Sequence, residues 1–173
     1  YSKNITEISS KILSESLSHL KNLKSMSLIL CLETSTKSCS VSLGQDGKLL
    51  ALKESIDEKH SHAENLTLYI QEVCAQAKIN LKDIDAVAVS KGPGSFTGLR
   101  IGVSTAKGLC YALNKPLIAI NSLESMAVSC ISPQVLVCPM IDAKRMEVYC
   151  AVYDEALNEI KKTSAKIIDE SSF

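Results

Sequence analysis

Three short apolar segments follow one another near the start of the chain, with polar breaks between them. Residues 28–33 form an apolar run that ends in Glu-Thr-Ser-Thr, and residues 39–43 and 48–53 flank the sequence Gly-Gln-Asp-Gly. Short strand-like segments joined by tight turns are typical of antiparallel meanders. The pattern therefore predicts a three-stranded antiparallel meander over residues 28–53.

Helical and strand-like patterns alternate through the rest of the chain. Ser61 and Glu64 have capping-box spacing, and the apolar stripe that follows them consists of Leu66, Ile70, Val73 and Ala77. Residues 85–90 form a continuous apolar strand, as expected when both faces of a sheet are covered. The expected later elements are a helix at about 98–113, a strand at 116–120, a short helix that starts at Asn121 and Glu124, and strands at 135–141, 147–153 and 158–166. This order predicts an α/β fold.

The chain divides into three parts. We expect a first α/β lobe at residues 26–120 and the start of a second α/β lobe at residues 121–173. The second lobe has few elements to cover its strands, so we expect it to be truncated. Residues 1–25 form an extension that is predicted to be an amphipathic helix. Its apolar positions are Ile5, Ile8, Ile12, Leu13, Leu17, Leu20 and Leu23.

Composition limits the classes of function. The 173 residues carry 19 Lys and Arg and 19 Asp and Glu, so the formal net charge is zero. A neutral chain is not suited to bind a nucleic-acid backbone by bulk charge alone. The seven cysteines contain no C-x-x-C pair and lie mostly in apolar runs, as expected for buried thiols in a reducing compartment. No apolar run reaches the roughly 18–20 residues that span a bilayer. We therefore expect a cytoplasmic protein without a membrane segment.

The glycine-rich segment at residues 92–102 (GPGSFTGLRIG) has two interpretations. Its glycines free the backbone, and Ser95 or Thr97 can cap the helix that follows. Free N–H groups at a helix N-terminus bind anions, so a phosphate or nucleotide contact is one interpretation. Its candidate residues are Thr34, Ser35, Gly94, Ser95 and Arg100. The second interpretation of this segment is a tight strand-to-helix turn without a ligand. It is favoured by the spacing, which fits neither a Walker A loop nor a dinucleotide fingerprint.

The helix that follows this turn is apolar around most of its girth. Gly98, Gly102, Ala106 and Cys110 form one smooth face of small residues, and Ile101, Thr105, Gly108 and Ala112 form another. A helix of this kind has neighbours on more than one side. We expect one side to meet the sheet of its own lobe and the other to meet a second subunit.

Three further constellations leave alternatives open. His60 and His62 lie beside Glu64, but no third ligand is evident, so no metal site is predicted. Asp142, Lys144 and Arg145 form either a charged contact patch or a solvated hairpin turn. Glu33, Thr34 and Ser35 form either a loop that contacts a nucleotide or a plain turn in which Thr34 and Ser35 bond the backbone, and the second alternative is favoured.

Five segments occur together in an order that closely resembles the TsaB (YeaZ) family. They are LILCLETS at 28–35, HAENLTLYI at 62–70, GPGSFTGLRIG at 92–102, NSLESMA at 121–127 and IDAKRMEVY at 141–149. The resemblance implies a fold of the actin-like ATPase, Hsp70 and sugar-kinase type. It also implies a role in making N6-threonylcarbamoyladenosine on adenosine 37 of tRNAs. Proteins of this family are non-catalytic, pair with a TsaD-like catalytic subunit that a TsaE-like ATPase joins, and also form homodimers.

Comparison with TsaD-like subunits indicates no catalytic residues in this chain. Those subunits hold a metal with two histidines four positions apart on a helix, whereas Ser122 and Met126 stand at the matching positions. We therefore expect no cofactor on this chain itself, ATP and a divalent metal on partner subunits, and tRNA contact only through the complex. The partner interface is predicted at His62, Leu66, Tyr69, Ile70, Val73, Ile101, Thr105, Gly108 and Ala112. The alternatives are a small-molecule kinase or ATPase of the same fold, and a metalloprotease, which the absent histidine pair disfavours.

Overall fold

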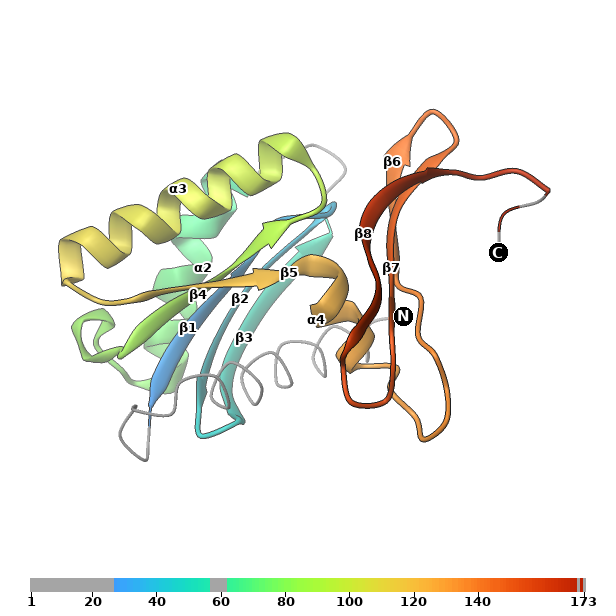
Figure 1. Ribbon diagram of the computed structural model, residues 1–173. Coiled ribbons are helices and arrows are strands. Elements are labelled where there is room, and N and C mark those ends of the chain that lie inside the picture. Colours follow the sequence, from blue (N-terminus) through green and yellow to red (C-terminus); the bar gives the residue numbers. More distant parts are fainter. Residues whose placement is uncertain (1–26, 57–61, 171, 173) are drawn as a thin grey trace.

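The computed structural model describes residues 27–56, 62–170 and 172, and it arranges them around two separate sheets (Figure 1). The first sheet has five strands in the order β3-β2-β1-β4-β5. Its strands are β1 (Leu28–Glu33), β2 (Ser38–Gln45), β3 (Lys48–Ile56), β4 (Ala86–Gly92) and β5 (Leu117–Asn121). The first three strands pair in antiparallel fashion, which confirms the predicted meander. Strands β4 and β5 continue the sheet in parallel with β1, so the carboxyl ends of these three strands share one edge.

Two helices cover one face of this sheet. Helix α2 (His62–Ala77) packs on β2 and β3, and helix α3 (Phe96–Leu113) packs on β4, β1 and β5. The apolar side chains between them form the core of the first lobe, and its fully buried members include Leu30, Leu32, Val41, Leu66, Val73 and Val87. A short 3-10 helix, η1 (Leu81–Asp83), leads from α2 to β4. The core thus comes from the apolar face of the sheet and the apolar stripes of both helices.

The second lobe begins directly after β5. Asn121 caps helix α4 (Ser122–Val128) by accepting hydrogen bonds from the backbone of Leu123 and Glu124, as the sequence predicts. Strands β6 (Met140–Lys144), β7 (Glu147–Tyr153) and β8 (Glu159–Ile167) form an antiparallel sheet. A second core joins α4 to this sheet through Leu123, Ala127, Ile141, Ala151 and Tyr153.

One predicted strand is wrong. Residues 135–141 were expected to form a strand, but β6 begins only at Met140, and Val137 makes just an isolated bridge with Tyr153. Pro139 lies between these two points and has no N–H to donate to a ladder. The predicted helix at residues 1–25 and the capping residue Ser61 lie outside the described residues.

Candidate functional site

The glycine-rich turn lies directly against the turn between β1 and β2. The Ser95 N–H donates to the backbone oxygen of Ser35 at 2.6 Å, and a Cβ on Gly94 would overlap the backbone of Ser35. Gly92 and Gly94 have φ values of +104° and +154°, which L side chains rarely adopt. The glycines therefore serve the close approach of two turns, as the tight-turn interpretation expects.

Helix α3 is anchored to the same β1–β2 turn. Ser95 caps the helix by accepting from the Gly98 N–H at 3.3 Å, and the Thr34 hydroxyl donates to the Gly98 carbonyl at 2.8 Å. A Cβ on Gly102 would overlap that same hydroxyl. The predicted face of small residues is therefore the inner side of α3, where Gly98, Gly102 and Ala106 are buried.

The polar groups of the β1–β2 turn are occupied by the protein itself. One carboxylate oxygen of Glu33 accepts from the Ser35 N–H at 2.6 Å, and the other accepts from the hydroxyl of Ser90 on β4. Thr34 and Ser35 are only 1% and 2% exposed. The Thr34 and Ser35 side chains are therefore buried against the neighbouring turn, and a phosphate contact at these two residues stays a prediction.

A small cavity lies below Glu33 at the carboxyl ends of β1 and β4. Its volume is about 20 Å³, and its polar lining consists of Glu33, Ser40, Ser42 and Ser90. This volume holds about one water molecule, whereas small-molecule sites are typically about 300–1,000 Å³. The cavity therefore offers a water site rather than a nucleotide pocket.

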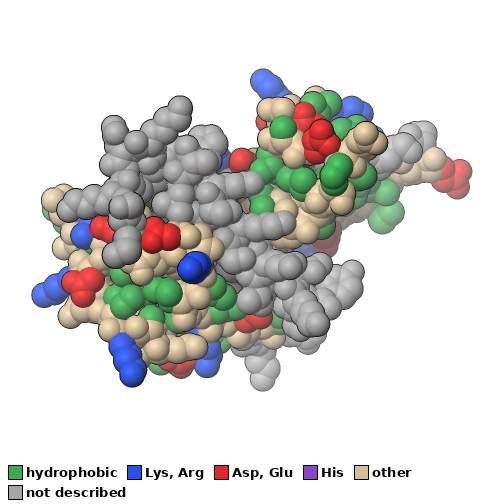
Figure 2. All heavy atoms as spheres, turned by 90° about the horizontal axis from the view of Figure 1, so that it is seen from below, with side chains coloured by type: hydrophobic (Ala, Val, Ile, Leu, Met, Phe, Trp, Pro, Cys, Tyr) green, Lys and Arg blue, Asp and Glu red, His purple; other side chains and the backbone are tan. Residues whose placement is uncertain are grey.

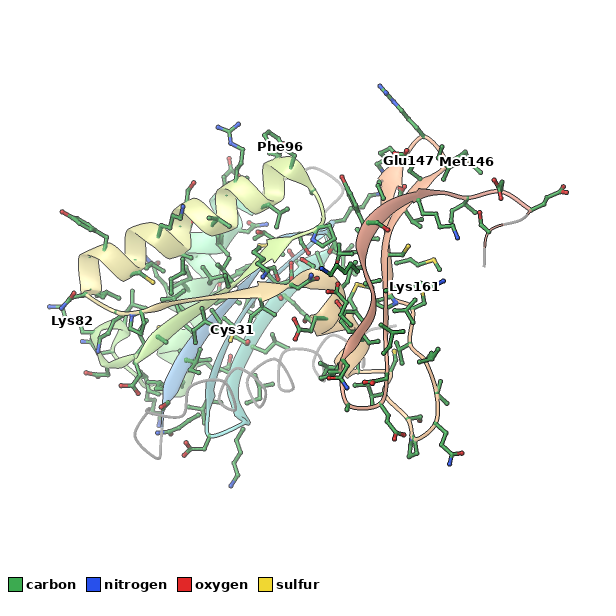
Figure 3. All side chains as sticks on the ribbon, viewed as in Figure 1. Cys31, Lys82, Phe96, Met146, Glu147 and Lys161 are labelled. Carbon is green, nitrogen blue, oxygen red and sulfur yellow. The ribbon has the colours of Figure 1, made fainter. Side chains whose placement is uncertain are left out.

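The remaining phosphate candidates lie near the surface at the start of α3. Gly94 is half-buried, whereas Ser95 and Arg100 are exposed. The Arg100 guanidinium lies over the ring of Phe96, 5.5 Å from its centroid, and Phe96 is 75% exposed and points away from the sheet (Figure 3). Sequence reasoning missed Phe96, although an aromatic residue four positions before an arginine on a helix is the signal for such a pair.

The predicted interface residues divide into two groups. Leu66, Tyr69, Ile70 and Val73 are buried in the core of the first lobe, so these four side chains serve the fold, and a partner contact at them stays a prediction. The physical reason is that the apolar stripe of a helix on a sheet is used to cover that sheet. The other candidates are Ile101 and Thr105, which are half-buried, and Gly108 and Ala112, which are exposed. The side chain of His62 and all of His60 lie outside the described part of the chain.

The outer side of α2 and α3 is the exposed surface that these candidates share. We use "outer side" for the solvent-facing surface that includes Leu68, Gly108, Tyr111 and Ala112. Tyr111 is 91% exposed, and a Cβ on Gly108 would meet nothing within 4 Å. The two helices touch each other and carry opposite charges: α2 has Glu64 and Glu72 and no lysine or arginine, and α3 has Arg100 and Lys107 and no acidic residue.

The cysteines have no sign of an activated thiolate. Burial raises the pKa of Cys31 to about 12 and that of Cys39 to about 11, the opposite of what a nucleophilic cysteine needs.

Among the described residues, no three His, Cys, Asp or Glu side chains gather to hold a metal ion. None of the helices in the described ranges has the length and hydropathy to cross a bilayer.

The hairpin between β6 and β7 fits the solvated-turn alternative. The Asp142 carboxylate accepts from the Lys144 N–H at 2.8 Å and pairs with the Lys144 ammonium at 2.9 Å. Both side chains are largely exposed, and these hydrogen bonds lower the pKa of Asp142. On the face drawn in Figure 2, acidic and basic side chains are interspersed, which agrees with the zero net charge.

Helix α4 holds the positions that matter for comparison with catalytic relatives. Ser122 is buried at its start, and Met126 packs against the core of the second lobe.

A family model described as "TsaD: tRNA N6-adenosine threonylcarbamoyltransferase" matches residues 51–172. The "tRNA threonylcarbamoyladenosine biosynthesis protein TsaB" of Escherichia coli K12 is 36% identical over 134 residues, which cover 76% of this chain and 57% of that protein. The chain belongs to the TsaB (YeaZ) family.

Further relatives agree with this assignment. The protein of the same name from Haemophilus influenzae is 36% identical over 123 residues, which cover 70% of this chain and 51% of that protein. The solved structure of YeaZ from Pseudomonas aeruginosa superposes with a TM-score of 0.74 at 28% identity, covering 86% of this chain and 71% of that one. The α/β fold expected for the TsaB (YeaZ) family is confirmed. The chain spans about half the length of the curated relatives it matches.

Proposed function

We propose that the chain is a non-catalytic subunit of the machinery that makes N6-threonylcarbamoyladenosine in tRNA, and that it binds and activates a TsaD-like catalytic subunit. The observation that carries this proposal is the outer side of α2 and α3, with its exposed apolar residues, its open glycine and its opposite charges. The names of the Escherichia coli and Haemophilus influenzae relatives support the tRNA modification.

The charge pattern fits a partner of the same fold. A TsaD family model matches most of the described chain, so a TsaD-like partner has related helices at its own surface. A two-fold arrangement in which α2 of one subunit packs against α3 of the other suits this surface. In a pair of identical chains the acidic residues of α2 would then face the basic residues of α3, and such complementarity favours correct pairing. Glu72 contributes less than Glu64 because Lys53 pairs with it at 2.7 Å.

The β1–β2 turn supports a role without catalysis. Glu33, Thr34 and Ser35 make hydrogen bonds with one another and with the start of α3, and the cavity beside them has room for about one water molecule. ATP and a divalent metal would then bind partner subunits, among them a TsaE-like ATPase, and tRNA would be reached through the complex. A homodimer through the same surface is the expected state when the partner is absent.

Gly108 gives the sharpest test of the proposed surface. Because nothing lies within 4 Å of its Cβ position, Gly108→Trp should leave the fold intact and block the close approach of a partner helix. We expect at least about a tenfold loss of affinity for the TsaD-like subunit in calorimetry, with an unchanged circular dichroism spectrum. Ser164→Trp on the exposed β8 is the matched control and should bind as the unchanged chain does.

Two outcomes would contradict the proposal. Equal affinity of Gly108→Trp and Ser164→Trp would remove the outer side of α2 and α3 from the interface. No binding of the unchanged chain, together with normal tRNA modification in cells that lack it, would exclude the function itself. Saturable, tight binding of Mg-ATP to the isolated chain would favour the alternative small-molecule kinase or ATPase.

A further inference from the structure

The antiparallel sheet of the second lobe has one face toward α4 and one face away from it (Figure 1). Tyr149 and Ala151 on β7, and Val137 before β6, point toward α4, because all three are part of the second core or pack against it. Side chains of an extended chain alternate between the two faces, so the neighbours of these residues point the other way. Cys138 follows Val137, and Cys150 lies between Tyr149 and Ala151. Two cysteines from separate segments therefore share the face away from α4.

The pairing of the two segments brings these cysteines together. Val137 forms a bridge with Tyr153, and Met140 pairs with Cys150. Cys138 lies between these two pairs, so it is a diagonal neighbour of Cys150 on the same face. The two side chains are hydrogen-bonded to each other, and both are free thiols. The second lobe thus holds two thiols in direct contact.

The chain around Cys138 can adjust to bring the two sulfur atoms into bonding distance. A disulfide needs its two Cβ atoms about 3.5–4.5 Å apart, which is closer than a diagonal pair in a regular sheet. Strand β6 begins only at Met140, and Pro139 has no N–H to donate to a ladder. Cys138 therefore lies outside the regular ladder, whereas Cys150 is held in the middle of β7. A small shift of the backbone at Cys138 supplies the difference.

Cys138 is the thiol of this pair that a small reagent reaches first. It is half-buried, whereas Cys150 is buried. Burial raises the pKa of the Cys138 thiol, and the ammonium groups of Lys161 and Lys166 on β8 act in the opposite direction. A positive charge beside a thiol stabilises the thiolate, which is the form that attacks a disulfide. The site combines an accessible thiol with a second thiol directly behind it.

We propose that Cys138 and Cys150 form a reversible disulfide when the chain meets a small-molecule disulfide such as oxidised glutathione. The Cys138 thiolate attacks one glutathione sulfur and releases one glutathione thiolate. The Cys150 thiolate then attacks the Cys138 sulfur, forms the internal bond and releases the second glutathione thiolate. The two protons that the cysteines lose go to the two glutathione thiolates, and two electrons pass from the protein to glutathione.

The bond would fasten the segment before β6 to the middle of β7, beside the point where Pro139 interrupts the ladder. It closes a short loop that contains the β6–β7 hairpin, and such a cross-link restricts the unfolded chain. We therefore expect the second lobe to open less readily in the oxidised chain. The inference does not depend on the proposed tRNA-modification role, because the pair lies in the second lobe, apart from α2 and α3.

A matched pair of serine substitutions tests the bond. Cys130 and Cys138 both lie between α4 and β6, but only Cys138 contacts Cys150. The full chain is equilibrated with reduced and oxidised glutathione, quenched with acid and mapped by mass spectrometry without reduction. We expect an internal disulfide at Cys150, with two hydrogen atoms lost and no glutathione added, in the unchanged chain and in Cys130→Ser. Cys138→Ser should lower its amount by at least about tenfold.

Two cysteines of the first lobe give a comparison within the same sample. Cys31 and Cys39 lie on the neighbouring strands β1 and β2, but they belong to clusters on opposite faces of that sheet. Proximity along two paired strands is therefore not sufficient for a bond. We expect no peptide that joins Cys31 to Cys39 under conditions that join Cys138 to Cys150.

Three results would overturn the proposal. They are glutathione adducts at Cys138 without an internal bond, a bond from Cys150 to Cys130 in place of Cys138, and an equal amount of the bond in Cys138→Ser. The cross-linked peptide of the unchanged chain, sequenced by fragmentation, decides between the first two results without any variant. If Cys138→Ser changes the circular dichroism spectrum, Cys138→Ala is judged by the same criterion.

Discussion

On the inner side of α3, Gly98, Gly102 and Ala106 lie against the sheet and the β1–β2 turn, whereas Gly108 on the outer side has open space around it. Gly102 has no room for a methyl group because the Thr34 hydroxyl occupies that place. The same helix thus carries one glycine that the fold requires and another that nothing within the described chain requires.

This difference separates residues that serve the fold from residues that serve recognition. An exposed glycine in a helix costs about 1 kcal/mol of stability relative to alanine. The inner glycines offset that cost by allowing the contact between Thr34 and Gly98. Gly108 allows no comparable contact inside the lobe, so its cost in stability is not offset there. A glycine at this position fits the close approach of a partner helix.

The largest effect is expected for Gly102→Ala. The new methyl group would force Thr34 to rotate away from the Gly98 carbonyl or would push α3 off the sheet. Overpacking and a lost buried hydrogen bond together outweigh the better helix propensity of alanine, so we expect a net loss of about 2 kcal/mol in the free energy of unfolding. Denaturation in urea measures it.

A double-mutant cycle tests the cause of that loss. If the clash with Thr34 dominates, Thr34→Ala should cost less in the Gly102→Ala background than in the unchanged chain, because the smaller side chain makes room. Strict additivity of the two substitutions would show that Gly102 is needed for another reason.

A smaller loss is expected for Thr34→Val. Valine keeps the shape of threonine and removes only the hydroxyl that donates to Gly98 at 2.8 Å. The Gly98 carbonyl keeps its place in the helical ladder, so we expect a loss of about 1.5 kcal/mol in the same urea measurement. Thr34→Ser, which keeps the donor, should lose less; a larger loss for serine would indicate that the methyl group matters more than the hydrogen bond.

Removing the helix cap should have a slightly smaller effect. Ser95 accepts from the Gly98 N–H through its side chain, and Ser95→Ala leaves that donor without its cap. We expect a loss of about 1 kcal/mol in thermal unfolding, the usual value for a lost serine cap. Ser95→Asp should restore most of it, whereas equal stability of the alanine variant and the unchanged chain would contradict the role of this cap.

The two sides of α3 also mark what the sequence could predict. The spacing of Gly98, Gly102 and Ala106 predicted a smooth face, but a helix that is apolar around its girth does not reveal which side meets the sheet. The amphipathic pattern of α2 was predicted correctly, but the sequence alone did not show that its apolar stripe packs in the core of the first lobe. In both cases the sequence does not show which side of the helix is covered by the sheet of its own lobe, because that depends on the tertiary structure.

The hydrogen bonds of the β1–β2 turn could not be predicted from the sequence for a different reason. The chain pattern identified Glu33, Thr34 and Ser35 as a turn, but one of the two hydrogen bonds that Glu33 accepts comes from Ser90, 57 positions away. The succession of elements along the chain and the caps at Ser95 and Asn121 depend on local sequence and were predicted correctly. The exception is the strand expected at residues 135–141, where Pro139 prevents pairing. Exposure of Phe96 likewise follows only once α3 is placed on the sheet.

Gly108→Ala gives the smallest effect and the opposite sign from Gly102→Ala. The position is helical, exposed and free of neighbours, so alanine should stabilise the chain by about 0.5–1 kcal/mol in urea denaturation. A partner helix that needs the open position should still bind less tightly to this more stable variant. Higher stability with weaker binding would therefore assign Gly108 to recognition, whereas higher stability with unchanged affinity would show that the outer side of α3 tolerates a methyl group and that contact there is less close than we propose.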